Sequence, residues 1–592
     1  MSLDSSRPDH AARPRRTVIV GGVAGGMSAA TRLRRLDAER EIVVLERSGA
    51  VSYANCGLPY HLGGAIPERG SLELQTPDGL RNRFGLDVRV QTEAVAIDSV
   101  AQTVEARDLR TGRVEQIAYD ELVLAPGARP RRPERLAAGA EVETLRTLDD
   151  LDRIADAVDA LDPGAPVVVI GAGHLGIEIA DNLHRRGLAV ALVQRGTHLL
   201  PALDAEMTAP LADHLLGLGI DVRVGAGIAE VGAREVRLTS GVRLPAALTI
   251  AAMGVEPETA LARTAGIEVG PAGGIVVDGL HRTGIPNIFA IGDAAEKVDA
   301  IDLASRPVAL AGLANRHGRH VADVIAGGDS TPASPALGTS IVDVAGVTAA
   351  SVGWNEARAR SKGRSVRVLH SHPLSHAGYY PGARPMSLKL VVDAVDDRIL
   401  GAQAVGTEGV ARRIDVIAVA MSAGLRASAL ADLELAYAPQ YGSAKDPVNQ
   451  LGYLARNRAS GGDRTIQWHE LDEAVSDGAM LLDVRAEAQL DEGLIPGATW
   501  IPVEELRSRQ AEFAGRPIVV HCRVGQGAHT AARLLAELGH DVRNLDGGYL
   551  TWRDGMRSRE LATASKAAAE PAADSGADEA DSVHDLDERS AA

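Results

Sequence analysis

Cysteine and aromatic residues are scarce in this chain of 592 residues, which has two Cys and 3% aromatic residues. Two cysteines cannot build a framework of disulfides, so we expect a protein of the reducing cytoplasm. With so few aromatic side chains, the hydrophobic cores must rest on Val, Leu, Ile and Ala. The length allows about three to five domains, each with a core of its own.

Long apolar runs are also missing, since none reaches the roughly 18 residues that a membrane-spanning helix needs. Arg15-Arg16 has the form of a twin-arginine signal, but no apolar signal region follows it, so we do not expect export. The net charge of -17 argues against a nucleic-acid partner. No group of residues has the spacing of a metal site, and we expect no metal.

The first chemical motif is a glycine-rich turn between an apolar strand and a helix. The strand Thr17–Val20 leads into the turn, a helix is predicted from near Met27, and a second strand, Glu41–Leu45, follows. This order is the dinucleotide-binding fingerprint: glycines let the backbone approach a pyrophosphate, and an acid binds ribose hydroxyls. The predicted contacts are Gly21, Gly22, Ala24, Gly25, Gly26, Glu46 and Arg47. Val23 departs from the pattern, because it stands where the second glycine is usual.

A second fingerprint follows the buried-strand run Val167–Ile170. It predicts a helix from near Ile177 and a strand over Ala189–Val193, and two such motifs in one chain indicate two nucleotides. The second strand ends in Gln194-Arg195 without the usual acid, which favours the 2′-phosphate of NADPH slightly over NADH. The predicted contacts are Gly171, Gly173, His174, Leu175, Gly176, Glu178, Gln194 and Arg195.

The chain then returns to the first nucleotide site. A strand within 286–294 ends in Gly292-Asp293, which suits a second contact to a flavin nucleotide. The turn 125–127 is similar to the one at which flavoproteins with two dinucleotide sites leave their first domain. We therefore predict a discontinuous first domain with the second domain inserted. Ala125, Gly127, Gly254, Gly292, Asp293 and Ala309 complete the predicted cofactor contacts.

Each cysteine lies beside a feature that suggests chemistry. Cys56 stands shortly after the first fingerprint, where a lone cysteine suggests redox activity rather than packing. Cys522 follows the strand Pro517–Val520 and precedes a helix predicted from Thr530. Backbone N–H groups and the helix dipole would favour its thiolate form, which predicts a site for a persulfide or an oxyanion.

Residues 16 to 455 resemble the single-cysteine pyridine nucleotide-disulfide oxidoreductases, and among them the coenzyme A-disulfide reductases. Residues 464 to 558 resemble a rhodanese domain. The most specific motifs are 52–57, 437–449 and 547–552. The resemblance implies an α/β protein with two Rossmann-like domains, an α+β dimerisation domain and a rhodanese-like α/β domain. The expected bounds are 16–148 and 271–333 for the FAD-binding domain, 149–270 for the NAD(P)-binding domain, 334–456 for the dimerisation domain, 464–558 for the rhodanese domain and 559–592 for a disordered tail.

The resemblance also implies a mechanism. Disulfide reductases with two cysteines place them five apart, but the position five after Cys56 is His61. The partner of Cys56 is therefore a small thiol, held as a mixed disulfide, or an oxygen, held as a sulfenic acid. The family implies coenzyme A, with contacts at Ser28, Arg32, Arg35, Ser52, Asn55, Asn315, Arg316 and Lys445. Tyr379 or Tyr380, together with Tyr437, match tyrosines that reach the partner subunit's active site in this family, which implies a homodimer.

The rhodanese part departs from its family's pattern twice. Leu494 replaces the usual His, and Gly527 replaces the usual Arg of the cysteine loop, for which Arg523 would compensate only if it points inward. We expect a cytoplasmic enzyme that uses FAD and NAD(P)H to reduce coenzyme A disulfide or persulfide, with Cys522 carrying sulfane sulfur. Two alternatives stay open. One is an oxidase or peroxidase that cycles Cys56 through sulfenic acid, and the other is a non-catalytic redox-sensing flavoprotein.

Overall fold

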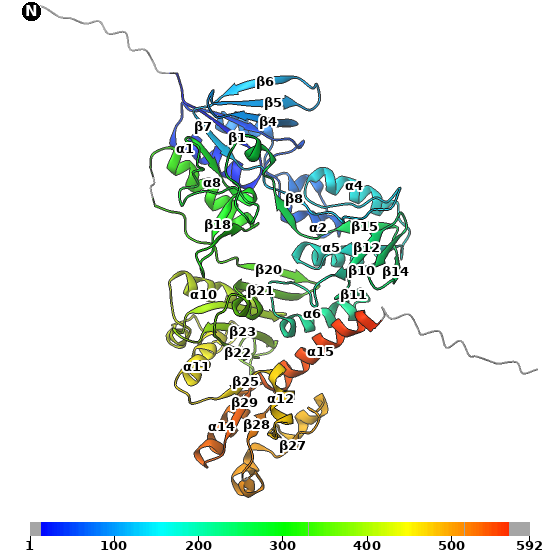
Figure 1. Cartoon of the computed structure of the whole chain (residues 1–592), viewed down its shortest axis with the longest axis vertical. Coiled ribbons are helices and arrows are strands. Elements are labelled where there is room, and N and C mark those ends of the chain that lie inside the picture. Colours follow the sequence, from blue (N-terminus) through cyan, green and yellow to red (C-terminus); the bar gives the residue numbers. More distant parts are fainter. Residues whose placement is uncertain (1–12, 329–330, 514, 568–592) are drawn as a thin grey trace, which may run out of the picture.

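The computed structural model describes residues 13–328, 331–513 and 515–567, which form four α/β or α+β units along one long axis (Figure 1). As expected from the composition, the cores are mainly aliphatic. No helix within the described residues is long and apolar enough to cross a membrane.

The first unit is built on a parallel sheet in the order β17-β7-β1-β2-β3. Its strand β17 comes from far along the chain and pairs in parallel with β7. The expected discontinuous domain is thereby confirmed. The elements are β1 (Arg16–Val20), β2 (Glu41–Leu45), β3 (Asp87–Arg89), β7 (Glu121–Leu124) and β17 (Ile288–Ala290), with helices α1 (Ala24–Leu36) and α8 (Ala311–Ile325) packed together.

The second unit is inserted into the first and repeats its plan with the strand order β11-β10-β9-β15. All three pairings in this sheet are parallel. Its strands are β9 (Pro166–Ile170), β10 (Ala189–Gln194), β11 (Asp221–Val224) and β15 (Leu248–Ala251), and its helices include α4 (Leu148–Asp159), α5 (His174–Arg185) and α6 (Ala205–Gly217).

The third unit is an antiparallel sheet in the order β20-β21-β24-β23-β22 with helices α10 (Val410–Ser422) and α11 (Pro447–Ala459). Its strands are β20 (Ser340–Val344), β21 (Val347–Gly353), β22 (Val366–Ser371), β23 (Met386–Asp393) and β24 (Ile399–Gly406).

The fourth unit is a parallel sheet in the order β25-β29-β28-β26-β27. Its strands are β25 (Thr465–Ile466), β26 (Met480–Asp483), β27 (Thr499–Trp500), β28 (Ile518–His521) and β29 (Val542–Leu545), and its longer helices are α14 (Gln526–Glu537) and α15 (Gly548–Ala567).

Three helices begin three or four residues earlier than predicted, at Ala24, His174 and Gln526. Glycine disfavours helices, yet Gly26, Gly176 and Gly527 lie in the first turns of these helices. In the first two turns the glycines belong to the helix because only they fit. A Cβ on Gly26 would lie 1.9 Å from the Gly21 carbonyl oxygen, and one on Gly176 would lie 1.8 Å from that of Gly171.

The predicted disordered tail from residue 559 is wrong for its first part, because α15 continues as a helix to Ala567. The red helix in Figure 1 lies along α6 and β11 of the second unit. Arg557 Nε donates to Asp213 Oδ1 at 2.8 Å, and Leu561 packs against the core cluster that contains Met207 and Leu211. Tertiary contacts therefore order a segment whose own sequence shows no periodicity. Residues 568–592 lie outside the described residues.

Candidate functional site

The first glycine turn has the shape of a dinucleotide cradle. Gly21 has φ +103°, and a Cβ there would lie 2.0 Å from the Ala125 carbonyl oxygen. Glu46, buried at the end of β2, accepts the Gly22 N–H at 2.7 Å. Val23 caps α1 without a side-chain hydrogen bond, which leaves the first N–H groups for an anion. These residues fit the FAD that the fold implies.

Two contacts predicted for the flavin nucleotide, Gly127 and Asp293, and the predicted coenzyme A contact Asn55 meet a residue that was not predicted, Arg146. Its Nη2 donates to Asp293 Oδ2 at 2.7 Å, and its carbonyl accepts Asn55 Nδ2 at 3.1 Å. Its guanidinium also lies against Gly127, which has φ +78°. Arg146 thereby connects the Cys56 segment to the returning strand. It precedes the capping box of α4, formed by Thr147 and Asp150, but nothing in the sequence indicates its distant partners.

Four predicted cofactor contacts lie in the loops around these turns or at the start of a helix. Gly254 has φ +89° and Ala309 is exposed before α8. Arg47 is exposed and lies 4.0 Å from Glu258. Leu175 lies in the first turn of α5. No contact among the described residues assigns these four a role.

Cys56 lines a cavity of about 430 Å³ in the first unit. The cavity brings Cys56 together with five residues predicted to bind coenzyme A, namely Ser28, Arg35, Ser52, Asn55 and Asn315. Three other predicted residues do not line it: Arg32 pairs with Asp323 at 2.6 Å, and Arg316 and Lys445 are exposed elsewhere.

The cavity also has a cationic and aromatic part that was not predicted. Arg83 and Phe84, from helix α3 (Pro77–Phe84), line it together with Gln75. The guanidinium carbons of Arg35 and Arg83 lie 5.4 and 5.2 Å from the centre of the Phe84 ring. Two cations and a flat ring suit a ligand that carries phosphates and a base. In the sequence, the adjacent residues Arg83 and Phe84 are the feature from which this cationic and aromatic part of the cavity could have been predicted.

The surroundings of Cys56 favour its uncharged forms. Burial raises the pKa of the Cys56 thiol, the carboxylate of Glu178 raises it further, and Arg146 opposes both. Burial likewise raises the pKa of Glu178, whose Oε1 accepts the Tyr60 hydroxyl at 3.0 Å. Loss of hydration penalises a thiolate but not a disulfide. This direction favours the thiol over the thiolate, although Cys56 itself is exposed.

The second glycine turn repeats the cradle with a neutral residue in place of the acid. A Cβ on Gly171 would lie 2.4 Å from the Ala252 carbonyl oxygen. Gln194 Oε1 accepts the Ala172 N–H at 3.2 Å, and Arg195 beside it is exposed. His174 Nε2, at the start of α5, is buried without a hydrogen-bond partner. The open helix N-terminus fits the pyrophosphate of NAD(P), and the unpaired ring nitrogen of His174 beside it is one further polar contact for the nucleotide.

Cys522 lies at the bottom of a tight loop between β28 and α14. It is 7% exposed, and the Gly525 N–H donates to its Sγ at 3.2 Å. A Cβ on Gly527 would lie 3.5 Å from the same sulfur, so the missing Arg leaves an open position directly beside it. The loop therefore directs one N–H, that of Gly525, at the sulfur.

Arg523 does not compensate for the Arg that is missing at Gly527, because a carboxylate already pairs with it. Its Nε donates to both carboxylate oxygens of Glu492, at 2.7 and 2.8 Å, and this pair neutralises its charge. Leu494, two residues after Glu492, is 59% exposed at the position of the usual His. Beside Cys522 the usual Arg is thus absent at Gly527 and Arg523 is paired with Glu492, while Leu494 places an apolar side chain where the pattern has a His.

The matches to family models follow this division of the chain. Residues 15–311 match the pyridine nucleotide-disulphide oxidoreductase model, residues 340–447 match the dimerisation domain of that family, and residues 467–554 match the rhodanese-like domain. This chain belongs to the pyridine nucleotide-disulphide oxidoreductases. It is an FAD-dependent oxidoreductase with a C-terminal rhodanese domain, as expected.

Named relatives agree with this assignment. The chain is 35% identical to a coenzyme A disulfide reductase of Staphylococcus aureus (strain JH9) over 443 residues, which cover 74% of this chain and 99% of that protein. The chain of the crystal structure of reduced Bacillus anthracis CoADR-RHD is 41% identical to this chain, with a TM-score of 0.90. The match covers 92% of this chain and 99% of that chain. The structure of an NAD-dependent persulfide reductase from A. fulgidus is 33% identical to this chain, with a TM-score of 0.85, and the match covers 91% of this chain and 100% of that chain.

The tyrosines predicted to reach a partner subunit lie on the surface of the dimerisation domain of this oxidoreductase. The hydroxyls of Tyr379 and Tyr437 are 2.8 Å apart, although Tyr379 is 77% exposed. Tyr380 is exposed beside them. None of the three lines the Cys56 cavity of its own chain. Their exposure leaves them available to a second copy.

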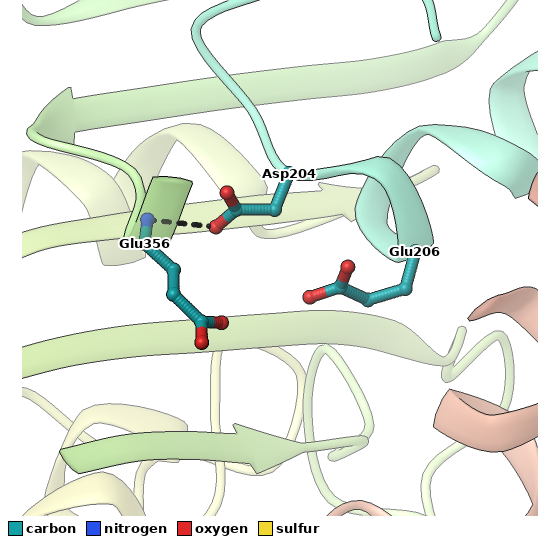
Figure 2. Close-up of side chains that lie close together, drawn as sticks. All are labelled: Asp204, Glu206 and Glu356. Carbon is teal, nitrogen blue, oxygen red and sulfur yellow. Dashed lines mark hydrogen bonds between the residues drawn. The ribbon is translucent and has the colours of Figure 1, made fainter. Parts of the chain in front are cut away.

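A cluster of three buried carboxylates in the oxidoreductase looks at first like a metal site. Asp204, Glu206 and Glu356 point toward one another in Figure 2. The ammonium group of Lys389 fills the space between them, with Nζ at 2.9, 2.5 and 2.8 Å from their oxygens. A lysine therefore supplies the positive charge that a metal ion would supply. The sequence gives no sign of this cluster, because its members come from distant segments.

Proposed function

We propose that this oxidoreductase reduces coenzyme A disulfide and coenzyme A persulfide with NAD(P)H, and that Cys522 carries sulfane sulfur. The observation that carries the proposal is the cavity that joins Cys56 to Arg35, Arg83 and Phe84. A thiol that enters it can reach Cys56 while its phosphates and base meet the cations and the ring. The relatives named for coenzyme A disulfide and persulfide support this substrate class.

The sulfur chemistry at Cys56 has two exchange steps. The Cys56 thiolate attacks coenzyme A disulfide, forms a Cys56–coenzyme A disulfide, and releases one coenzyme A thiolate. Two electrons and a proton from NAD(P)H then cleave the mixed disulfide, which restores Cys56 and releases the second coenzyme A. When bound, FAD supplies hydride acceptance from the nicotinamide and two-electron transfer to sulfur.

With coenzyme A persulfide, the same attack on the inner sulfur leaves the Cys56–coenzyme A disulfide and releases hydrosulfide. Cys522 would supply this persulfide by transferring its outer sulfur to the thiolate of coenzyme A. Burial raises the pKa of Cys56, and Glu178 and Asp293 raise it further, which favours the thiol over the thiolate in the free enzyme. Arg146 would stabilise the thiolate when it is released.

Two further parts of the proposal concern the cofactor and the assembly. Gln194 in place of an acid, beside the exposed Arg195, favours NADPH at least as much as NADH. The dimerisation domain favours a homodimer. In it, Tyr379, Tyr380 and Tyr437 would complete the partner's active site.

Mass spectrometry of the purified enzyme tests the proposal. We expect coenzyme A as an adduct on Cys56, released by a reducing agent, and we expect Cys56→Ser to keep FAD but to lose disulfide and persulfide reduction. Ser71→Ala, at the end of a neighbouring 3-10 turn, is a matched control that should keep both. Turnover of coenzyme A disulfide by Cys56→Ser would refute the mechanism. A sulfenic acid on Cys56 without coenzyme A would favour the oxidase or peroxidase alternative.

A further inference from the structure

A histidine of the dimerisation domain is buried at the interface with the rhodanese domain. His370, near the end of β22, has Nδ1 at 2.8 Å from Asp546 Oδ2 and Nε2 at 3.2 Å from Glu206 Oε1. Asp546 follows β29 of the rhodanese domain, and Glu206 lies on α6 of the nucleotide-binding unit. One imidazole thus connects three domains, and its side chain and that of Asp546 are each 1% exposed.

The charges around His370 make it a double donor. Burial alone would lower the pKa of His370, but Asp546 and Glu206 outweigh it and raise the pKa to about 9. The imidazolium that results at neutral pH carries an N–H on both ring nitrogens, as two carboxylate partners require. Asp546 also accepts from Arg458 and, at 3.1 Å, from Gln467 Nε2. The carboxylate is therefore held from several sides.

Two glycines connect Asp546 to the Cys522 loop. Gly547 and Gly548 have φ +68° and +63°, which only glycine adopts readily. A Cβ on Gly547 would lie 2.7 Å from the His370 Cβ, and one on Gly548 would lie 2.4 Å from the Cys522 carbonyl oxygen. The backbone is therefore packed between His370 and the sulfur loop.

Hydrogen bonds continue this packing into the site itself. The Tyr549 N–H donates to the Cys522 carbonyl at 2.8 Å. A Cβ on Gly548 would also lie 2.8 Å from the Gly525 nitrogen, whose N–H donates to the Cys522 sulfur. A shift of residues 546–548 would therefore move the donor that binds the sulfur.

We propose that His370 is a positioning residue for sulfur transfer at Cys522. The rhodanese domain does not set the geometry of its cysteine loop alone, because the reductase body holds the 546–548 segment through His370. The Lys389 cluster holds Glu206 in turn, so the charge behind His370 is also fixed. The catalytic consequence rests on the proposed sulfur chemistry of Cys522, whereas the structural consequence does not.

Two measurements on the full-length His370→Gln variant test the inference. The first is sulfur transfer from thiosulfate or inorganic polysulfide to a thiol acceptor, with kcat and KM measured separately. The second is the rate at which iodoacetamide alkylates Cys522 in enzyme that has first been reduced to release any thiol bound to Cys56, with the Cys56 peptide as the internal reference. A misplaced loop should lower kcat for sulfur transfer by about tenfold or more with little change in donor KM. It should raise the alkylation of Cys522 while reduction of coenzyme A disulfide stays at the wild-type rate.

Matched variants separate positioning from damage to the fold. Arg367→Gln, on the same strand, removes a 2.6 Å ion pair with Asp397 within the dimerisation domain, and should leave both measurements unchanged. Asp546→Asn, which also weakens the contacts with Arg458 and Gln467, should have at least the effect of His370→Gln, and the double variant should be no worse than Asp546→Asn alone. Asp546→Asn also serves alone if His370→Gln does not fold.

Several outcomes would overturn the inference. These are an unchanged Cys522 alkylation rate together with unchanged sulfur transfer, a loss shared equally with the Cys56 reaction, or additive effects in the double variant. If the wild-type enzyme transfers no sulfur, the proposed function of Cys522 fails. The alkylation rates still decide whether His370 positions the loop.

Discussion

The choice between NADH and NADPH depends on two neighbouring side chains, which can be changed without disturbing the turn that they support. Gln194 Oε1 accepts the Ala172 N–H at 3.2 Å, in the way that Glu46 accepts the Gly22 N–H in the first unit. Gln194→Glu keeps the shape and this hydrogen bond. It adds a negative charge where the ribose of the nucleotide binds, and that charge repels a 2′-phosphate but accepts a 2′-hydroxyl.

The size of the effect follows from the hydrogen bonds at stake. Loss of a contact between Arg195 and a 2′-phosphate costs about 1.5–3 kcal/mol, so Arg195→Ala should lower kcat/KM for NADPH by roughly 10- to 150-fold. NADH has no such phosphate, so its kcat/KM should stay unchanged in this variant. Gln194→Glu should lower kcat/KM for NADPH and raise it for NADH.

Steady-state kinetics with both nucleotides and a single acceptor decide the matter. Arg185→Ala is the matched control, because Arg185 lies in the last turn of α5 and pairs with Asp181 at 2.9 Å, at the opposite end of that helix from the glycine turn. It should leave the ratio of the two kcat/KM values unchanged. If Arg195→Ala also leaves the ratio unchanged, Arg195 is a solvated surface charge and the reasoning from the missing acid is wrong.

Two other sites give predictions of the same kind. Gly527→Arg should raise kcat/KM for thiosulfate by roughly 10- to 150-fold through a new charge-assisted contact. Gly527→Leu, which adds similar bulk without charge, should not raise it. Equal effects of the two variants would show that the charge has no role. Cys522→Ala should slow sulfide release from polysulfide and spare reduction of coenzyme A disulfide, and an equal loss of both reactions would contradict the assigned roles. Lys389→Met should lower the free energy of unfolding near neutral pH by about 3–5 kcal/mol, measured by urea denaturation against the exposed control Lys362→Met. Lys389 holds the pKa of Glu206 and Glu356 below the ordinary range despite their burial. The variant should therefore recover part of the lost stability as the pH falls and these carboxylates become protonated. A loss of stability that does not depend on pH would contradict this.

Local patterns predicted the two strand–turn–helix units because these units are local in the chain. Strand, glycine turn and helix follow one another within a short segment, so Gly21, Gly171 and their neighbours could be named from sequence alone. The predicted starts at Met27 and Ile177 were three residues late, because the close backbone contacts that place Gly26 and Gly176 inside the helices are visible only in the structure. The cysteine loop was likewise found from its position between a buried strand and a helix.

Contacts between distant segments could not be predicted from one sequence. Arg146 joins residues 55 and 293, and Lys389 joins residues 204, 206 and 356, but no periodicity or motif marks either residue. The end of α15 was missed for the same reason, because its order comes from packing on α6 rather than from its own composition. Arg523 shows the converse case, since its sequence position was noted but its pairing with Glu492 was not.

The packing of α15 on α6 has a consequence for dividing the protein. A cut in the linker after α11 would remove the helix that carries Leu561 and Arg557, and would uncover the surface of α6 beneath them. The reductase half would then expose to water the part of the apolar cluster around Met207 and Leu211 that Leu561 covers. His370 would lose Asp546 and keep Glu206. Expressed separately, the two halves should therefore be less soluble than the whole chain and should associate again when mixed.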